Sequence, residues 1–200
     1  RAENKLSAED QFRLVTPEAI NSLSPQEKAN YENRLLDAAG KLSQRAPDES
    51  FFAGKEVSGP VTGKATNFGY NDSEDSGYGS PLVGDGKGGM VATNNTNIRG
   101  VALPREVLEN FFQIPKGSTK YSDWEGVRRA AVEVTNSSGK REVVPIVDIG
   151  PGIIPVSRGV VIDETKAVNQ NMGGDGQRTY RIVPNYYQNE DDRDIEYVKK

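Results

Sequence analysis

The feature that most constrains this chain is a pair of strand-forming runs that each end in an aspartate. Residues 141–148 are rich in β-branched side chains and lead into a Gly-Pro turn, and a shorter run at 160–163 ends in a second carboxylate. Apolar, β-branched runs bounded by glycine and proline are typical of strands that end in turns. We therefore expect Asp148 and Asp163 to lie at the rim of a β-sheet.

The composition favours one loop-rich β domain and narrows its chemistry. A chain of 200 residues can bury one sizeable core, and 21 glycines and 11 prolines favour strands and turns over a helical bundle. There is no cysteine and no histidine. Disulfides, thiolate nucleophiles and Ser-His pairs are thereby excluded, which leaves carboxylates, lysine and tyrosine for acid–base chemistry. We expect no cofactor and no bound metal.

The charge and hydropathy of the chain limit the classes of partner that it is expected to bind. A formal net charge of -4 gives no general attraction to nucleic acid or to an anionic membrane. No apolar run approaches the roughly 20 residues of a membrane span, so we expect no transmembrane segment. The first residues contain neither methionine nor a signal-like apolar run, so we expect a processed or trimmed chain. The sequence leaves the oligomeric state open, and we expect a monomer.

Residues 1–50 predict a helical extension. Ser24 and Glu27 have the spacing of a capping box, with a proline between them at the first helical position, and they predict a helix over about 25–45. Its apolar residues fall on one stripe that must dock on something: Tyr31, Leu35, Ala38 and Leu42. Packing against the main domain is the simpler interpretation, and binding of a partner protein is the alternative.

Residues 51–187 predict the main β domain, and 188–200 predict an acidic, solvated tail. The clearest signal is a hairpin of strands at 130–135 and 141–148 around a turn at 136–139. Further elements are expected as strands at 57–68, 160–163 and 178–184, and as helices at 105–112 and 164–172.

Two polar segments have alternative interpretations. The acidic, glycine-rich residues 71–89 suggest a calcium loop, but they lack the EF-hand order of ligands and the Walker spacing for phosphate, which favours a solvated loop or lid. Trp124 lies in a polar insertion, where it either packs half-buried or stacks on a sugar ring beside a groove.

The two aspartates also have structural alternatives. An Asp148 that is partly desolvated at the end of an apolar strand can hold a proton for delivery, or it can simply cap the turn that follows. Asp163 precedes an expected helix, so capping that helix is favoured over catalysis. Glu164 and Lys166 are expected on the surface of the same helix.

The 146–150 run also resembles an aspartic protease loop, but Ile149 replaces the hydroxyl residue and only one such loop is present, which disfavours a protease.

Residues 60–184 resemble the rare lipoprotein A (RlpA)-like double-psi β-barrel family. Five segments occur in the family's order, which makes the resemblance specific although each is weak alone. They are Gly63 to Gly69 (G-x-A-S-x-Y/F-G in the family), Val101 to Pro104 (A-x-x-L-P), Val132 to Lys140 (V-x-V-T-N hairpin), Asp148 to Pro151 (D-R-G-P) and Arg158 to Asp163 (G-R-x-I-D-L-S).

The resemblance implies a mainly β fold, a six-stranded double-psi β-barrel with an N-terminal helical extension and long loops, and a groove for glycan strands. Membrane-bound lytic transglycosylase A and expansin-like barrels are related. Carried over, Asp148 acts as general acid and base on peptidoglycan with help from Asp163. The implied substrate contacts are Asn67, Tyr70, Arg158 and, by stacking, Trp124. The resemblance also implies an exported protein of the periplasm, cell envelope or extracellular space.

The chain departs from the family pattern at three points. The family's histidine before its L-P segment is absent, Ile149 replaces the arginine of D-R-G-P, and Asp163 is followed by Glu-Thr instead of Leu-Ser. These departures motivate an alternative function, a non-catalytic carbohydrate-binding or envelope-structural module. A third possibility is a protein–protein adaptor that uses the N-terminal helices.

Overall fold

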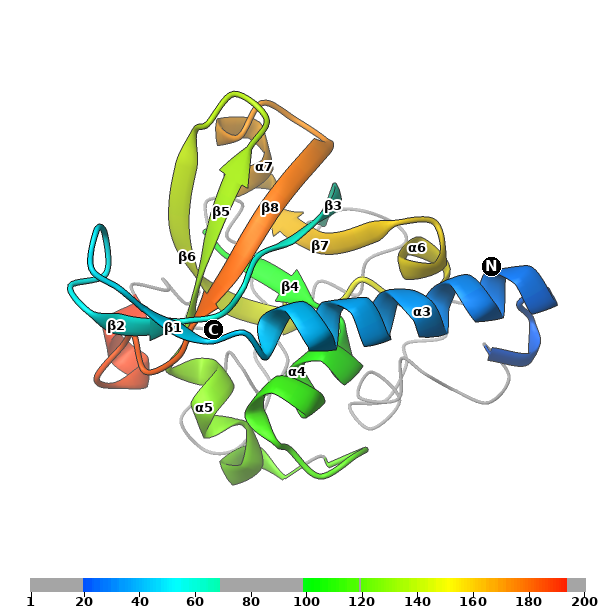
Figure 1. Cartoon of the computed structure of the whole chain (residues 1–200), viewed down its shortest axis with the longest axis horizontal. Coiled ribbons are helices and arrows are strands. Elements are labelled where there is room, and N and C mark those ends of the chain that lie inside the picture. The colour runs from blue at the N-terminus through cyan, green and yellow to red at the C-terminus, as the bar shows by residue number, and fades with distance from the viewer. Residues whose placement is uncertain (1–19, 69–98, 119, 194–200) are drawn as a thin grey trace, which may run out of the picture.

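A closed six-stranded β-barrel stands at the centre of the molecule, with helices packed around it (Figure 1). The computed structural model describes residues 20–68, 99–118 and 120–193. The helices are α3 (Pro25–Leu42), α4 (Arg105–Phe112), α5 (Glu125–Arg128), α6 (Ile153–Ser157), α7 (Lys166–Asn171) and the 3-10 turns η2 (Tyr121–Trp124) and η3 (Glu190–Arg193). The strands are β1 (Ala46–Asp48), β2 (Lys55–Val57), β3 (Val61–Phe68), β4 (Val101–Leu103), β5 (Ala131–Asn136), β6 (Arg141–Ile149), β7 (Val160–Thr165) and β8 (Gly176–Val183).

The barrel closes in the order β3-β7-β4-β6-β5-β8, and β8 pairs back onto β3. Two pairs, β3–β7 and β4–β6, are parallel, and the other four are antiparallel. The predicted six-stranded barrel with an N-terminal helix is confirmed, and its strands are of mixed direction. Closure leaves no free edge in this sheet, so backbone groups along the strands find partners within the barrel.

Alternating side chains fill the barrel interior. The predicted hairpin is confirmed as β5 and β6, with Thr135 opposite Arg141 next to the turn. On β8, Tyr180 and Ile182 face the same way as predicted, and both are almost completely buried. On β7, Ile162 is buried between the half-buried Val161 and Asp163, as expected for a strand with one face in the core.

The predicted capping box and apolar stripe of α3 are confirmed. The Ser24 hydroxyl accepts a hydrogen bond from the Glu27 amide at 3.2 Å, and the Glu27 carboxylate accepts one from the Ser24 amide at 2.9 Å. The stripe is buried at Tyr31, Ala38 and Leu42, and the last two belong to the same core cluster as the barrel. The helix therefore docks on the barrel, as the simpler interpretation predicted.

The end of α3 approaches the barrel strands very closely. A Cβ atom on Gly59 would lie only 2.2 Å from the backbone oxygen of Lys41, so only glycine allows this approach. Among the described residues, no helix is long and apolar enough to cross a membrane.

Two elements differ from the sequence prediction. The helix expected at 164–172 begins only at Lys166, with Thr165 at its N-cap, so Asp163 and Glu164 remain in β7. The predicted capping role of Asp163 and the predicted surface position of Glu164 are therefore wrong, because strand pairing with β3 and β4 extends through both residues. The expected solvated tail is not fully solvated either, since Arg193 is buried.

Candidate functional site

The two strand-terminal aspartates lie on either side of one small residue. Ala102 of β4 is the register partner of Asp148 on β6 and also of Asp163 on β7. Residues paired across neighbouring strands point their side chains to the same face of a sheet. Two inter-strand spacings separate the two aspartate Cα atoms by about 10 Å. The pair predicted from the sequence is thus brought together across β4.

This face is the outer wall of the barrel. Val101 and Leu103, on either side of Ala102, belong to the core cluster, whereas Ala102 does not. Both aspartates are half-buried, while their strand neighbours Ile149 and Ile162 are buried. The two carboxyl groups therefore stand on the outside of the barrel, above a position that carries only a methyl group.

Gly150 completes a floor of small residues beneath the carboxylates. A Cβ on Gly150 would lie 3.3 Å from Oδ2 of Asp163 and 3.6 Å from the Cβ of Ala102. The Asp163 carboxylate thus reaches across β4 toward the turn that follows Asp148. The Gly150 amide donates to the Leu103 carbonyl at 3.0 Å, which holds this turn against β4.

Thr66 is a site residue that the sequence analysis did not single out. It pairs with Asp163 across β3 and β7, and its hydroxyl donates a hydrogen bond to Oδ1 of Asp163. A hydrogen bond from a hydroxyl fixes the orientation of the carboxylate. The only sequence signal for this contact was the position of Thr66 in the Gly63–Gly69 segment, one residue before the predicted Asn67.

Asp148 is held by the backbone of its own turn. Its Oδ1 accepts a hydrogen bond from the Ile149 amide at 2.7 Å, so the carboxylate does make the local turn contact that was the structural alternative. The following Gly150–Pro151 peptide bond is cis. Ile149 itself points inward and belongs to the core cluster, so it adds no polar group to the outer face.

Three helices meet where the chain continues beyond this turn. The side chain of Tyr31 on α3 packs with Ile153 and Val156 of α6, which begins two residues after Pro151. The hydroxyl of Tyr31 donates a hydrogen bond to Oε1 of Glu106 on α4 at 2.5 Å. Burial, and then the bond to Glu106, raise the pKa of Tyr31 well above its usual range. The neutral tyrosine therefore links α3, α4 and α6.

Arg158, one of the predicted substrate contacts, lies near the start of α3. Arg158 is exposed in the turn between α6 and β7, and its charge helps to lower the pKa of Glu27 at the start of α3, after the hydrogen bonds from Ser24. The positive charge of Arg158 therefore acts on the N-terminal end of α3. Tyr70 and the possible calcium loop at 71–89 lie outside the described residues.

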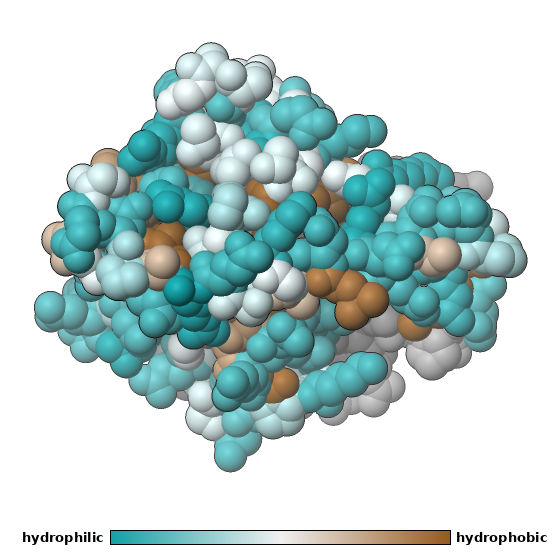
Figure 2. Space-filling view, in the orientation of Figure 1, coloured by the Kyte–Doolittle hydropathy of each residue, from teal (hydrophilic) through white to brown (hydrophobic). Residues whose placement is uncertain are grey.

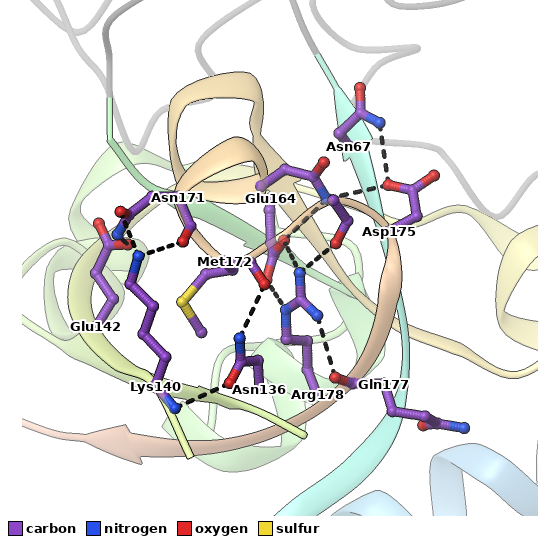
Figure 3. A network of polar contacts seen from close by, with 12 residues as sticks. Asn67, Asn136, Lys140, Glu142, Glu164, Asn171, Met172, Asp175, Gln177 and Arg178 are labelled. Carbon is purple, nitrogen blue, oxygen red and sulfur yellow. Dashed lines mark hydrogen bonds and ion pairs between the residues drawn. The ribbon is translucent and has the colours of Figure 1, made fainter. Parts of the chain in front are cut away.

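Asn67 lies next to the site, at one end of the barrel (Figure 3). Its side-chain amide donates to Oδ1 of Asp175 at 3.1 Å, and Asn169 donates to the same oxygen at 3.0 Å. Asn169 also donates to Glu164 at 3.0 Å. Asn67 thus belongs to a hydrogen-bonded network that leads from the surface to Glu164.

Glu164 and Arg178 form a buried ion pair at the centre of that network. Both Nε and Nη2 of Arg178 donate to the Glu164 carboxylate, at 2.7 and 3.1 Å. Nη2 also donates to the carbonyl of Gly174, and Nη1 to that of Gln177. Every charged group of the pair is hydrogen-bonded, which is what a buried ion pair requires. This ion pair was not predicted from the sequence.

Trp124 does not line an open surface. Its side chain is 0% exposed and packs in the core cluster, and its Nε1 donates to the Ser118 carbonyl at 3.2 Å. The guanidinium of Arg105 lies over its ring. The stacking role predicted for Trp124 is therefore incompatible with this conformation, because η2 and α5 form a helical corner that folds the ring inward.

The comparisons with known proteins add no family to this description. No protein-family model and no curated protein sequence matches the chain. Within the described residues, no group of three or more acidic side chains is close enough to hold a metal ion. What the site offers is a pair of carboxylates over a floor of small residues, with one of them held by a hydroxyl.

Proposed function

We propose that this protein acts on cell-wall glycan, as a lytic transglycosylase-like enzyme with Asp148 as general acid and base. The observation that carries the proposal is the register of Asp148 and Asp163 on either side of Ala102, on the outer wall of a closed barrel. The ordered sequence resemblance to the RlpA-like double-psi β-barrel supports the choice of peptidoglycan as substrate. On this proposal the protein works in the periplasm, the cell envelope or the extracellular space.

In the proposed reaction one carboxyl group performs both proton transfers. Asp148 donates its proton to the glycosidic oxygen as the bond to the anomeric carbon breaks. The 6-hydroxyl of the same sugar attacks that carbon and returns its proton to Asp148, which leaves a 1,6-anhydro ring and a free sugar hydroxyl. Such a reaction needs no second carboxylate to activate water.

Asp163 has a separate task in this proposal. Because the Thr66 hydroxyl holds it in one orientation, Asp163 is suited to stabilise the positive charge that develops on the sugar ring. Between the two aspartates the barrel wall carries only the methyl group of Ala102 and the bare backbone of Gly150. The two aspartates thus divide proton transfer and charge stabilisation between them.

A non-catalytic carbohydrate-binding or envelope-structural module is the second candidate. It is favoured by Ile149, which occupies the position of the family's arginine but is buried in the core. No polar side chain therefore stands directly beside Asp148 in the chain to assist bond cleavage.

Incubation with purified murein sacculi tests the enzyme proposal. The wild-type protein is expected to release anhydro-muropeptides, detected by liquid chromatography and mass spectrometry. Asp148→Asn removes the transferable proton and is expected to abolish release, and Asp163→Asn to reduce it strongly. Asp192→Asn, at an exposed carboxylate in η3, is the matched control and should leave release unchanged.

Sedimentation with the same sacculi separates the two candidates. Binding without anhydro products supports the module and rejects the enzyme. Absence of both binding and products rejects each of them, and equal release by wild type and Asp148→Asn removes the catalytic role of that residue.

A further inference from the structure

The outer wall of the barrel opposite the aspartate pair carries a row of hydroxyl groups. In the ring order of the strands, β8 stands three places from β4 in either direction, so these two strands lie on opposite sides of the barrel. Thr179 of β8 pairs with Thr62 of β3 and with Thr135 of β5. Thr135 in turn pairs with Arg141 of β6. Because residues paired across strands share a face, these four side chains form one row across four strands.

This row lies on the surface of the protein. The alternate residues of the same strands, such as Val134 and Tyr180, point inward and are buried in the core, whereas the side chains of the row are exposed or half-buried. Figure 1 shows β8 between β5 and β3, and Figure 2 shows from the same side that the surface over these strands is mostly hydrophilic or near neutral. Three inter-strand spacings give the row a length of roughly 14 Å.

The groups of the row keep hydrogen-bonding capacity for a ligand. The hydroxyl oxygens of Thr62 and Thr179 are 2.8 Å apart and share one hydrogen bond, so the second hydroxyl hydrogen of this pair can be donated outward. Neither the Thr135 hydroxyl nor the Arg141 guanidinium is hydrogen-bonded to any residue that the structure describes. A hydroxyl both donates and accepts, so a row of hydroxyls matches a ligand that is itself rich in hydroxyls.

An exposed aromatic ring and a balanced charge adjoin one end of the row. Phe51, in the loop between β1 and β2, is 52% exposed, and the Arg141 guanidinium lies 4.7 Å from the centre of its ring. Oε2 of the buried Glu133 has no hydrogen-bond partner among the described residues and lies 3.7 Å from Nη1 of Arg141. Because this carboxylate offsets the charge of the guanidinium, an uncharged ligand is favoured over an anion.

We propose that this wall is a second glycan-binding face, which holds an uncharged stretch of a glycan strand without cleaving it. The length of the row suits a chain of sugars, its hydroxyls suit sugar hydroxyls, and the ring of Phe51 suits the apolar C–H face of a sugar. The inference rests on the proposed function for the choice of cell-wall glycan, and it adds a face remote from Asp148 and Asp163. One molecule can therefore hold two strands, one on each wall.

An NMR titration tests where the glycan binds. Glycan strands cleared of their peptides by an amidase are added to the Asp148→Asn protein, in which the proposed reaction cannot take place. The methyl signals of Thr62, Thr135 and Thr179 are expected to shift. The dissociation constant is read from the Thr62 signal, so that it reports this wall alone. Signals that shift only around Asp163 would reject the second face.

Substitutions test which groups of the wall bind the glycan. The double variant Thr135→Val, Thr179→Val removes two hydroxyls and keeps the shape of the side chains, so it is expected to weaken binding about tenfold. Phe51→Ala should weaken binding about threefold to tenfold. Ser122→Ala, at an exposed hydroxyl in η2, and Leu36→Ala, at an exposed apolar side chain of α3, are the matched controls and should bind as before. Thermal melting checks that each variant is folded.

Three further outcomes would overturn the assignment. Equal affinity of the double variant and Ser122→Ala would show that the hydroxyl row binds no glycan. An affinity that falls steeply with salt would assign the wall to an anion. A dimer in light scattering that Phe51→Ala dissociates would assign it to a second copy of the chain.

Product analysis separates this inference from the proposed function. Wall signals that shift, together with no anhydro-muropeptides from wild type, would reject the enzyme and support the second face. Anhydro-muropeptides from wild type without shifts at the wall would support the enzyme and reject the second face.

Discussion

Two adjacent carboxylates on β7 have opposite environments. Asp163 points outward, is half-buried and accepts a hydrogen bond from Thr66, whereas Glu164 points inward, is 0% exposed and is bound by Arg178. Successive side chains of a strand point to opposite faces of the sheet, and this alone places the two carboxylates on opposite sides of the barrel wall. A carboxylate on the outer wall can bind a ligand, whereas a fully buried carboxylate at the end of the barrel has a structural role. The same residue chemistry thus has two uses at consecutive positions.

The outer carboxylate Asp163 is held in place next to the buried ion pair of Glu164. Thr66 and Asp163 form one register pair of β3 and β7, and Asn67 and Glu164 form the next. The network of Figure 3 ties Glu164 to Asn67 through Asn169 and Asp175. We expect mutations on the inner side to affect stability first and mutations on the outer side to affect activity first.

Removal of the inner cation should give the largest effect on stability. Arg178→Met leaves Glu164 buried without a counter-charge, which costs about 3–5 kcal/mol of the free energy of unfolding. Urea denaturation measures this loss. Adding Glu164→Gln to Arg178→Met should recover much of it, and Arg158→Met, at an exposed arginine, should change stability by no more than about 0.5 kcal/mol. A loss as small as that of Arg158→Met would show that the pair is not buried as described.

Removal of the Thr66 hydroxyl should lower activity rather than stability, because Thr66 contacts the outer carboxylate Asp163. A hydrogen bond to a charged group contributes about 1.5–3 kcal/mol, so Thr66→Val is expected to lower the release of anhydro-muropeptides roughly tenfold or more. Thr66→Ser keeps the hydroxyl and should retain most of the activity. If valine and serine behave alike, the hydroxyl does not orient Asp163 for the reaction.

A methyl group on the floor should have a smaller effect. Gly150→Ala places a Cβ at 3.3 Å from the Asp163 carboxylate, which must then shift by a few tenths of an ångström. We expect a modest fall in product release, with the thermal midpoint nearly unchanged. Gly152→Ala, whose Cβ would meet no atom within 4 Å, is the matched control. Equal activity of the two variants would mean that the floor does not position Asp163.

The smallest effect on stability is expected at Asp48, which lies in β1, outside the barrel strand that carries Asp163 and Glu164. It should appear as a dependence of the melting temperature on acid pH. Hydrogen bonds from Phe51 and Ser50 hold the pKa of Asp48 well below its usual range. Because the folded pKa is depressed, this contribution is full above about pH 4, the unfolded value, and is lost as the pH falls further. Asp48→Asn should therefore melt slightly below wild type at pH 6, and the difference should shrink steadily as the pH is lowered from about 4 to about 2. A constant difference in melting temperature would contradict this origin.

Much of the fold was predictable because its signals are local. The capping box at Ser24, the β5–β6 hairpin and the apolar alternation of β8 each follow from neighbouring residues and were confirmed. The start of α7 was misplaced because Asp163 and Glu164 are also good helix-start residues. Pairing with β3 and β4, which the sequence does not display, keeps both of them in β7.

The residue types present in the chain already limit the acid–base chemistry that this protein can perform. Without histidine or cysteine the chain depends on carboxylates, and the runs before Asp148 and Asp163 already indicated strands that deliver two of them. The tertiary structure decided which groups meet. The two aspartates flank Ala102, Thr66 reaches Asp163, Arg178 neutralises Glu164 and Trp124 is buried, because the order in which the barrel strands pair brings together residues that are far apart in the chain.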